Sequence, residues 1–262
     1  MVNPRSKGKQ NSGVLYAAKK CGIKEIYSIG GAQAVAALAY GTKKINKVNK
    51  IVGPGNLYVT TAKKEIFGDV GIDMIAGPSE ITVVGDKHSN PNWITSDLIA
   101  QAEHDEQSQS ILISKDKNLI NKVKKLLFYQ LKKLPRRSVA TKSLKSNGIL
   151  ISVSSDKKLI EVINRIAPEH LELNIKNYKN YVNRITNAGS IFLGKYSTEA
   201  VGDYLAGTNH VLPTAGSAKF SSGLSVYDFY KRISYINLSK KGIETLGPSV
   251  ITLANFEGLE GH

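Results

Sequence analysis

The stretch Ile81-Thr82-Val83-Val84-Gly85 indicates the fold class when it is taken together with the segments that follow it. A short, mostly apolar run that ends at a glycine is typical of a buried strand. Residues 93–102 then show helical periodicity, and Ile111–Ser114 form a second run of the same kind. A strand, a helix and another strand in this order predict parallel strands joined by a crossover helix.

The same alternation extends along most of the chain. Further strands are expected at Ile26–Ile29, Lys50–Val52, Ile149–Val153 and Ser190–Leu193. Further helices are expected at Ala32–Tyr40, Asn118–Leu134, Lys157–Ile166 and Tyr178–Asn187. From Leu224 onward only helices are expected, at Ser225–Leu238 and Ser249–Glu257. We therefore predict an α/β fold with parallel sheets and with boundaries near Pro78 and Gly223.

Length and composition narrow the class of protein. The 262 residues include 41% hydrophobic and 22% charged residues, which is ordinary globular usage. The only cysteine, Cys21, excludes a disulfide framework and a cysteine-based zinc cluster. The longest apolar runs, such as Ala34–Tyr40, are far shorter than the roughly 20 residues of a membrane-spanning helix. Because the N-terminus has no apolar signal region, we expect a cytoplasmic protein without a membrane partner.

The formal charge of +15 invites a nucleic-acid-binding interpretation. Thirty of the 36 basic residues are lysines spread along the chain, and few arginines remain for bidentate contacts with bases or phosphates. The densest basic stretch, Lys117–Arg137, also carries leucines at helical spacing, which indicates a core-facing helix with a solvated lysine face. We therefore predict no nucleic-acid partner.

Two glycine turns follow expected strands. Gly30-Gly31 leads into a helix of small residues, and Gly53-Pro54-Gly55-Asn56 follows the next strand. Such turns allow a backbone to approach a phosphate at a helix N-terminus. They equally allow a helix to pack closely on its sheet, and the sequence alone leaves both interpretations open.

Histidines lie next to other polar residues in three places. Gln101 and His104 are three residues apart, so they share one face of a helix. Glu169 and His170 place a carboxylate beside an imidazole in a turn, which suits either proton transfer or a structural hydrogen bond. Residues 201–213 combine glycines with Asp203 and His210, a composition typical of a site loop. A glutamine ligand for zinc would be unusual, so Gln101 and His104 also fit a solvated pair on a surface helix. Together His104, His170, His210 and Asp203 offer the nitrogen and oxygen ligands that zinc accepts, and they indicate an enzyme.

In this order, the segments resemble the histidinol dehydrogenase family. The resemblance runs from about Val14 to His262. It rests on residues 30–42, Gly53-Pro54-Gly55-Asn56, Ala76-Gly77-Pro78-Ser79-Glu80, Gln101-Ala102-Glu103-His104, Pro168-Glu169-His170-Leu171, residues 189–194 and residues 202–214. It implies two incomplete Rossmann-like domains, a nucleotide-facing one at residues 1–78 and a second at 79–223. It also implies a helical segment at residues 224–262 that is exchanged between the subunits of a homodimer.

The resemblance also implies the site residues, position by position. The zinc ligands, which also bind the substrate, are Gln101, His104, Asp203 and His262, with one zinc ion per subunit and His262 supplied by the partner subunit. The catalytic acid/base residues are Glu169 and His170. Further substrate contacts are His170, His210, Ser79 and Glu257, and the contacts with NAD are Gln33 and Asn56.

The implied reaction is the oxidation of L-histidinol to L-histidine through the aldehyde, with two molecules of NAD, as the last step of histidine biosynthesis. A neutral imidazole at His170 removes the hydroxyl proton, and a carboxylate at Glu169 activates water for the second oxidation. Zinc then serves to bind and orient the substrate.

The family has an additional N-terminal portion that nothing in this sequence matches. We therefore interpret the chain as an N-terminally truncated member, with a separately encoded N-terminal piece as a further partner. One sheet is expected to be incomplete and to expose apolar surface. An active dehydrogenase and a non-catalytic remnant that binds zinc and histidinol remain as alternatives.

Overall fold

The computed structural model describes residues 1–5 and 8–262. The chain forms two compact units, residues 1–225 and residues 226–262, and each is described here by itself. A break at residue 225 lies close to the expected boundary near Gly223. The further division of the first unit at Pro78 stays a prediction.

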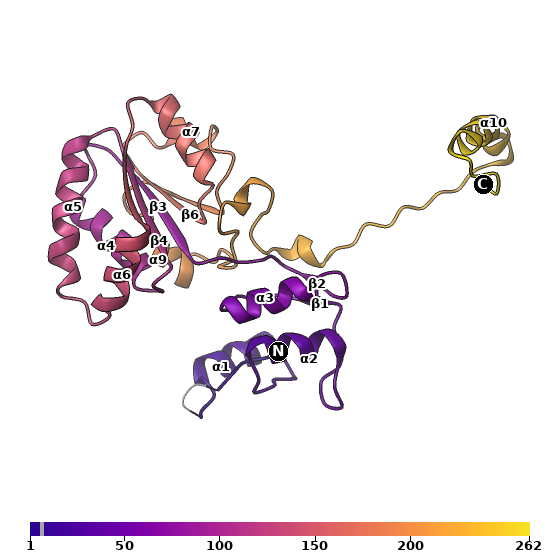
Figure 1. The fold of residues 1–262 in the computed structure, drawn as a ribbon, viewed down its shortest axis with the longest axis horizontal. Helices are drawn as coiled ribbons and strands as arrows, with labels where there is room; N and C mark the ends of the chain where they lie inside the picture. The colour runs from indigo at the N-terminus through magenta and orange to yellow at the C-terminus, as the bar shows by residue number, and fades with distance from the viewer. Residues whose placement is uncertain (6–7) are drawn as a thin grey trace. The chain divides into compact units, whose positions relative to one another are not determined.

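The larger sheet of the first unit has five parallel strands and lies among the helices of residues 91–166 (Figure 1). Its strands are β3 (Glu80–Gly85), β4 (Gln109–Ser114), β5 (Gly148–Ser152), β6 (His170–Asn174) and β7 (Ser190–Leu193), in the order β5-β4-β3-β6-β7. Every neighbouring pair is parallel. The predicted α/β class with parallel sheets is therefore confirmed.

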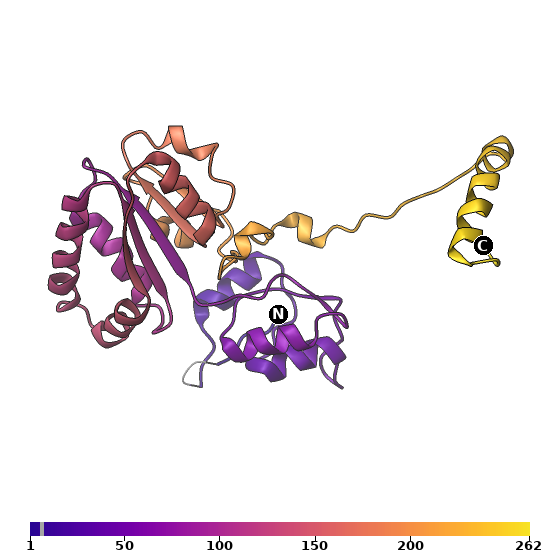
Figure 2. The same cartoon turned by 45° about the horizontal axis from the view of Figure 1, so that its top comes forward.

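Helices cover both faces of this sheet (Figure 2). On one face, α4 (Pro91–Ala102) and α5 (Lys117–Leu131) pack on side chains of β3 and β4 that include Ile81 and Leu112. On the other face, α7 (Asp156–Ile166) packs on β6 through Leu171 and Leu173. The remaining helices here are α6 (Arg137–Asn147), α8 (Lys179–Val182), α9 (Glu199–Tyr204) and a 3-10 turn at Ser217–Lys219. The helix expected at Tyr178–Asn187 is thus limited to the four residues of α8.

The N-terminal part of this unit contains a second, smaller parallel sheet. Its elements are α1 (Ser12–Lys20), α2 (Gly31–Tyr40), β1 (Lys50–Ile51), α3 (Leu57–Glu65) and β2 (Gly71–Ile72), with β1 paired to β2. The strand expected at Ile26–Ile29 is wrong, because among residues 1–5 and 8–262 only Tyr27 of this run finds a pairing partner, in an isolated bridge with Val2. An apolar run without a neighbouring strand cannot form a ladder.

This N-terminal part contains a buried ion pair and also large apolar side chains that are exposed. The ammonium group of Lys63 and the carboxylate of Asp73 form an ion pair, with side chains 4% and 0% exposed. Asp73 also accepts a hydrogen bond of 2.8 Å from the amide of Gly53, so the pair holds the second glycine turn. By contrast Tyr58 and Phe67 are 73% and 67% exposed, so large apolar surface faces outward here.

The second unit is less helical than expected. A 3-10 turn at Val226–Phe229 precedes α10 (Lys240–Glu257), and the helix expected at Ser225–Leu238 is wrong. The helix begins after Ser239 because this side chain accepts a hydrogen bond from the amide of Gly242. The helix expected at Ser249–Glu257 is present as part of α10, which begins earlier, at Lys240. In the described parts of the chain, no helix is both long and apolar enough to span a membrane.

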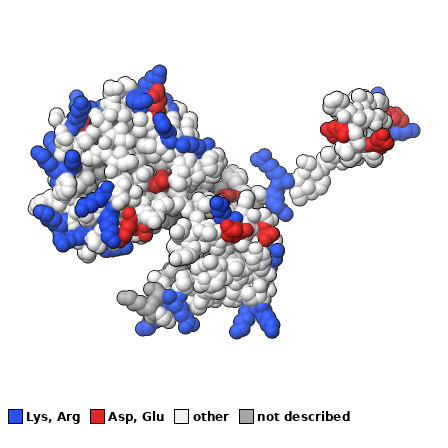
Figure 3. Space-filling model, viewed as in Figure 1, with Lys and Arg blue, Asp and Glu red and all other residues white. Residues whose placement is uncertain are grey.

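Lysine and arginine are scattered on the face seen in Figure 3, with no continuous basic stripe. The expectation of no nucleic-acid partner stays a prediction.

Candidate functional site

One face of β6 is polar although it is buried. His170 and Glu172 alternate with the core residues Leu171 and Leu173, so both polar side chains point to the sheet face that α4 covers. The register pairs His170 with Ile81 and Glu172 with Val83. The polar face therefore forms two layers, one at each of these register positions.

Two helices add polar side chains to both layers. Asp97 and Gln101 lie one turn apart on α4, and Glu199 and Asp203 lie one turn apart on α9. We call the layer at the start of β6, where His170 pairs with Ile81, the upper layer; it contains Gln101, His170 and Asp203. We call the layer two residues further along β6, where Glu172 pairs with Val83, the lower layer; it contains Asp97, Glu172 and Glu199. Figure 1 shows α4, α9 and β6 on the same side of the first unit.

His170 is 2% exposed and has one free ring nitrogen. Its Nδ1 donates a hydrogen bond of 2.9 Å to the carbonyl oxygen of Glu80. The proton therefore resides on Nδ1, and Nε2 keeps its lone pair without a hydrogen-bond partner among the described residues. Burial lowers the pKa of His170, which favours the neutral imidazole. A neutral imidazole with an unpaired ring nitrogen can act as a general base.

Glu169 precedes this strand and is 5% exposed. Its Oε2 accepts a hydrogen bond of 2.8 Å from the amide of Glu80 and lies 3.6 Å from His170 Nδ1. Burial raises the pKa of Glu169 to about 8, with contributions from the nearby carboxylates of Glu80 and Asp203. Adjacent acid and base side chains with displaced pKa values are typical of a site of proton transfer.

Asp203 and two histidines converge next to this pair. Asp203 Oδ1 lies 2.7 Å from His210 Nδ1 and 3.9 Å from His170 Nε2. One ligand atom from each of these three residues lies within 4.8 Å of the others, close enough to share a metal ion. Asp203 was expected in a loop, but the six-residue helix α9 carries it.

Gln101 and His104 lie at the end of α4. Gln101 Nε2 donates a hydrogen bond of 3.3 Å to His104 Nδ1. Gln101 is fully buried, and its Oε1 has no hydrogen-bond partner among the described residues. His104 lies near enough to His170 to lower its pKa. An aspartate and imidazoles fit the ligand chemistry of zinc, and the buried Gln101 Oε1 without a hydrogen-bond partner among the described residues leaves an oxygen available as a less usual further ligand.

The lower layer concentrates carboxyl groups in the interior. Burial raises the pKa of Asp97 to about 6 and of Glu199 to about 8, and it raises the pKa of Glu172 as well. The neighbouring Asp97 carboxylate further raises the pKa of Glu172, and the neighbouring Asp203 carboxylate further raises that of Glu199. Burial and like charges therefore favour the protonated form of these carboxyl groups.

The other predicted site residues lie on other elements. Ser79 directly precedes Glu80, at the start of β3. Gln33 lies in α2, and Asn56 caps α3 by accepting a hydrogen bond of 3.2 Å from the amide of Val59. Glu257 and His262 belong to the second unit. The roles of these residues stay predictions.

At the second glycine turn the structure offers a packing reason for glycine. A Cβ atom on Gly55 would lie 2.4 Å from the side chain of Val59. The close approach of turn and helix therefore requires glycine here, whatever else the turn binds.

Four residues of this region were missed in the sequence, namely Glu80, Asp97, Glu172 and Glu199. Glu80 Oε1 accepts a hydrogen bond of 2.9 Å from the amide of Ala215, 135 residues away. The only local signal was the alternation of polar and apolar residues at 170–174, which a solvated edge strand would also have.

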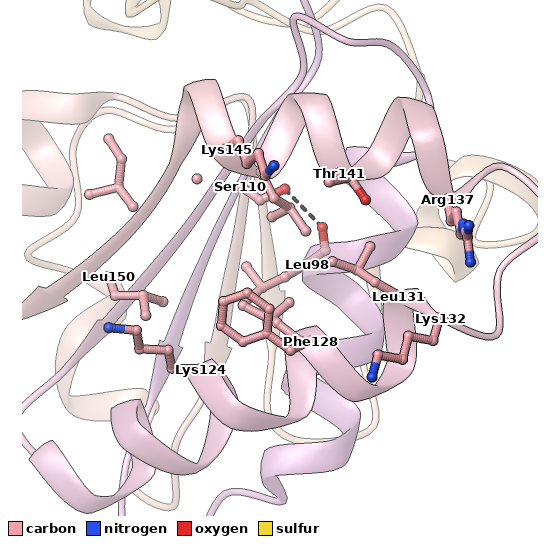
Figure 4. Close-up of a pocket in the computed structure, with 14 residues that line it drawn as sticks. Leu98, Ser110, Lys124, Phe128, Leu131, Lys132, Arg137, Thr141, Lys145 and Leu150 are labelled. Atoms are coloured by element: carbon pink, nitrogen blue, oxygen red, sulfur yellow. Dashed lines mark hydrogen bonds between the residues drawn. The ribbon is translucent and has the colours of Figure 1, made fainter.

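An apolar pocket of about 470 Å³ lies between α5, α6 and β5 (Figure 4). Leu131, Phe128 and Leu150 line it, with lysine side chains at its border. None of the predicted site residues lines this pocket, so it is separate from the polar layers.

Comparisons with known proteins agree with one family. The family model described as histidinol dehydrogenase matches residues 1–262. A histidinol dehydrogenase of Pelagibacter ubique is 70% identical over all of this chain, and one of Nitrosomonas europaea is 53% identical; the chain covers 61% of each. The crystal structure of histidinol dehydrogenase from Elizabethkingia anophelis superposes with a TM-score of 0.91 at 44% identity, over all of this chain and 60% of that one. The chain thus spans about three-fifths of the length of these relatives.

Proposed function

Because this chain belongs to the histidinol dehydrogenase family, we propose that it contributes to the oxidation of L-histidinol to L-histidine, through the aldehyde and with NAD, in the cytoplasm. The observation that carries the proposal is the buried, neutral His170 with a free Nε2 beside Asp203. A dehydrogenase acting on an alcohol needs such a base.

His170 is the base for the first oxidation. A hydride leaves an alcohol carbon only as the hydroxyl proton is removed, so the base must hold a free lone pair at the substrate. The hydrogen bond from Nδ1 to the Glu80 carbonyl oxygen orients the ring and leaves Nε2 to accept that proton. The nearby Asp203 carboxylate favours the protonated ring that results.

Glu169 is the base for the second oxidation. This step consumes a hydrated aldehyde, and the ionised carboxylate of Glu169 removes a proton from the attacking water. With a pKa of about 8, Glu169 is mostly protonated at pH 7. We therefore expect the second oxidation to become faster as the pH rises through 8.

Gln101, His104 and Asp203 of one chain, with the partner subunit's His262, are the residues proposed to hold zinc. The buried Gln101 Oε1 without a partner supports this assignment. When bound, zinc supplies a cation that orients the imidazole and the amine of the amino alcohol. His210, Ser79 and Glu257 complete the proposed substrate contacts.

The proposed assembly is a homodimer in which residues 224–262 are exchanged. NAD, when bound, supplies the hydride acceptor, and Gln33 and Asn56 are the proposed residues that hold it. Gln33 lies in the first turn of α2, and Asn56 is the N-cap residue of α3. The N-terminal amides of a helix favour an anionic ligand.

The experiment is NADH formation by the purified, zinc-loaded chain with L-histidinol and NAD⁺, against a chelator-treated control. Chelator-sensitive NADH formation supports the proposal. The variants Glu169→Gln and His170→Asn are expected to keep zinc and to lose NADH formation, and loss of zinc in either would contradict the separation of roles. Binding of zinc and L-histidinol without NADH formation would identify a non-catalytic remnant.

A further inference from the structure

We propose that Glu172 is a positioning residue for Asp203, which it acts on by fixing the first turn of α9. The inference rests on the proposed function, because it explains how Asp203 is held beside His170 and His210. Glu172 itself lies in the lower polar layer, two residues beyond His170 on β6, and its Oε1 accepts the hydrogen bond from the Glu199 amide.

The first contact is a cap supplied from a distant strand. The first amides of a helix have no partner within the helix and need an acceptor. The N-cap residue of α9, Thr198, makes no side-chain capping hydrogen bond. Instead Glu172 Oε1 accepts a hydrogen bond of 2.8 Å from the amide of Glu199, the first residue of α9. Glu172 on β6 therefore does the work of a helix cap for α9.

This contact fixes Asp203 because α9 is short. Glu199 and Asp203 are four residues apart, so they lie one above the other on one helix face. A six-residue helix has little stability of its own, and its position depends on its tertiary contacts. If the first turn shifts, Asp203 Oδ1 moves away from His210 Nδ1, at 2.7 Å, and from His170 Nε2, at 3.9 Å.

Glu172 is itself held from two sides. The strand register with Val83 fixes its backbone, and its carboxyl group lies close enough to that of Asp97 on α4 for the Asp97 charge to raise the pKa of Glu172. Glu172 thus joins α4, β6 and α9, the three elements that carry Gln101, His170 and Asp203. Outer residues of this kind orient the groups that contact a metal, and their loss costs roughly 10- to 100-fold in metal affinity.

Two substitutions separate positioning from general stability. Glu172→Gln keeps an amide oxygen that accepts the Glu199 amide proton, whereas Glu172→Leu has a similar volume and removes the acceptor. Ser143→Ala is the matched control, because Ser143 is fully buried on α6 and donates a hydrogen bond of 2.8 Å to the Ser108 carbonyl oxygen. Glu172→Met replaces the leucine variant if that variant fails to fold.

The first readout is amide hydrogen exchange in the metal-free chain. We expect the α9 amides of Glu172→Leu to exchange at least about 10-fold faster than those of the wild type, since the capping contact is lost. Glu172→Gln and Ser143→Ala are expected to match the wild type at α9. Equal exchange in the leucine variant and the wild type, or equal acceleration in the glutamine variant, would overturn the inference.

The second readout is titration with Co²⁺, followed by its visible absorption. The leucine variant is expected to bind Co²⁺ about 10- to 100-fold more weakly, with rescue by glutamine. Unchanged affinity in the leucine variant would also overturn the inference. A wild-type chain that binds no Co²⁺ would instead refute the proposed metal site, and hydrogen exchange at α9 would still decide the role of Glu172.

Discussion

The raised pKa of Glu169 predicts a pH-dependent cost in stability that Glu169→Gln removes. In the folded protein this pKa is about 8, against an ordinary value of 4.5. Between these two values the folded chain binds the proton and the unfolded chain releases it. The free energy of unfolding therefore falls as the pH rises through this window, by about 1.4 kcal/mol per pH unit.

From pH 5.5 to pH 7.5 this slope amounts to about 3 kcal/mol for this one group. Glutamine has no proton to release, and its amide oxygen still accepts the amide proton of Glu80. We therefore expect Glu169→Gln to gain about 3 kcal/mol relative to the wild type over these two pH units.

The assay is urea unfolding of both proteins at the two pH values, followed by circular dichroism. Asp156→Asn is the control without a pH effect in this window, because hydrogen bonds with Lys115 and Tyr181 lower the pKa of Asp156 below 3.8. Asp156 is ionised in both the folded and the unfolded protein from pH 5.5 upward. The effect of this variant on the free energy of unfolding is therefore expected to be the same at both pH values. A difference between wild type and Glu169→Gln that does not change with pH would refute the account of Glu169.

Three further predictions concern stability and metal binding. Lys63→Met leaves Asp73 buried without its cation and is expected to cost about 3–5 kcal/mol in urea unfolding, whereas an unchanged midpoint would contradict the buried pair. Gly55→Ala forces a methyl group against Val59 and is expected to cost about 1–3 kcal/mol, so an equally stable variant would show that the turn can move. Gln101→Leu removes a buried amide oxygen and is expected to leave the metal-free chain at least as stable while weakening zinc binding in a chelator competition; wild-type affinity would exclude Gln101 as a ligand.

The sequence predicts four strands of the five-stranded sheet because they are locally encoded, but it misses β6, since a turn was expected at Glu169 and His170 where His170 begins a strand. Ile81–Val84 and Ile111–Ser114 are short runs bounded by glycine or polar residues, and both are strands in the structure. Ile26–Ile29 has the same local pattern, but in the part of the chain that the structure describes it makes only the single bridge between Tyr27 and Val2. Ser225–Leu238 failed for a related reason, since the first strong cap is Ser239. Partners and caps, rather than composition, decide these segments.

The site was predictable only where residue type carries the chemistry. Histidines beside polar residues drew attention to His104, His170 and His210 without any knowledge of the fold. The lower layer was not predictable from the sequence. The hydrogen bond between Glu172 and Glu199 joins residues 27 positions apart, and the sequence does not distinguish a buried glutamate from a solvated one. Only the geometry of β6 and α9 distinguishes the two.

The most direct test of the central claim is the visible spectrum of the Co²⁺-loaded chain on addition of L-histidinol. The claim is that Gln101, His104 and Asp203 form one site with the acid/base pair Glu169 and His170. We predict that L-histidinol shifts the Co²⁺ bands at saturation, whereas L-alaninol, which keeps the amine but lacks the imidazole, gives a smaller shift. A chain that binds Co²⁺ but gives the same spectrum with and without L-histidinol would contradict the claim.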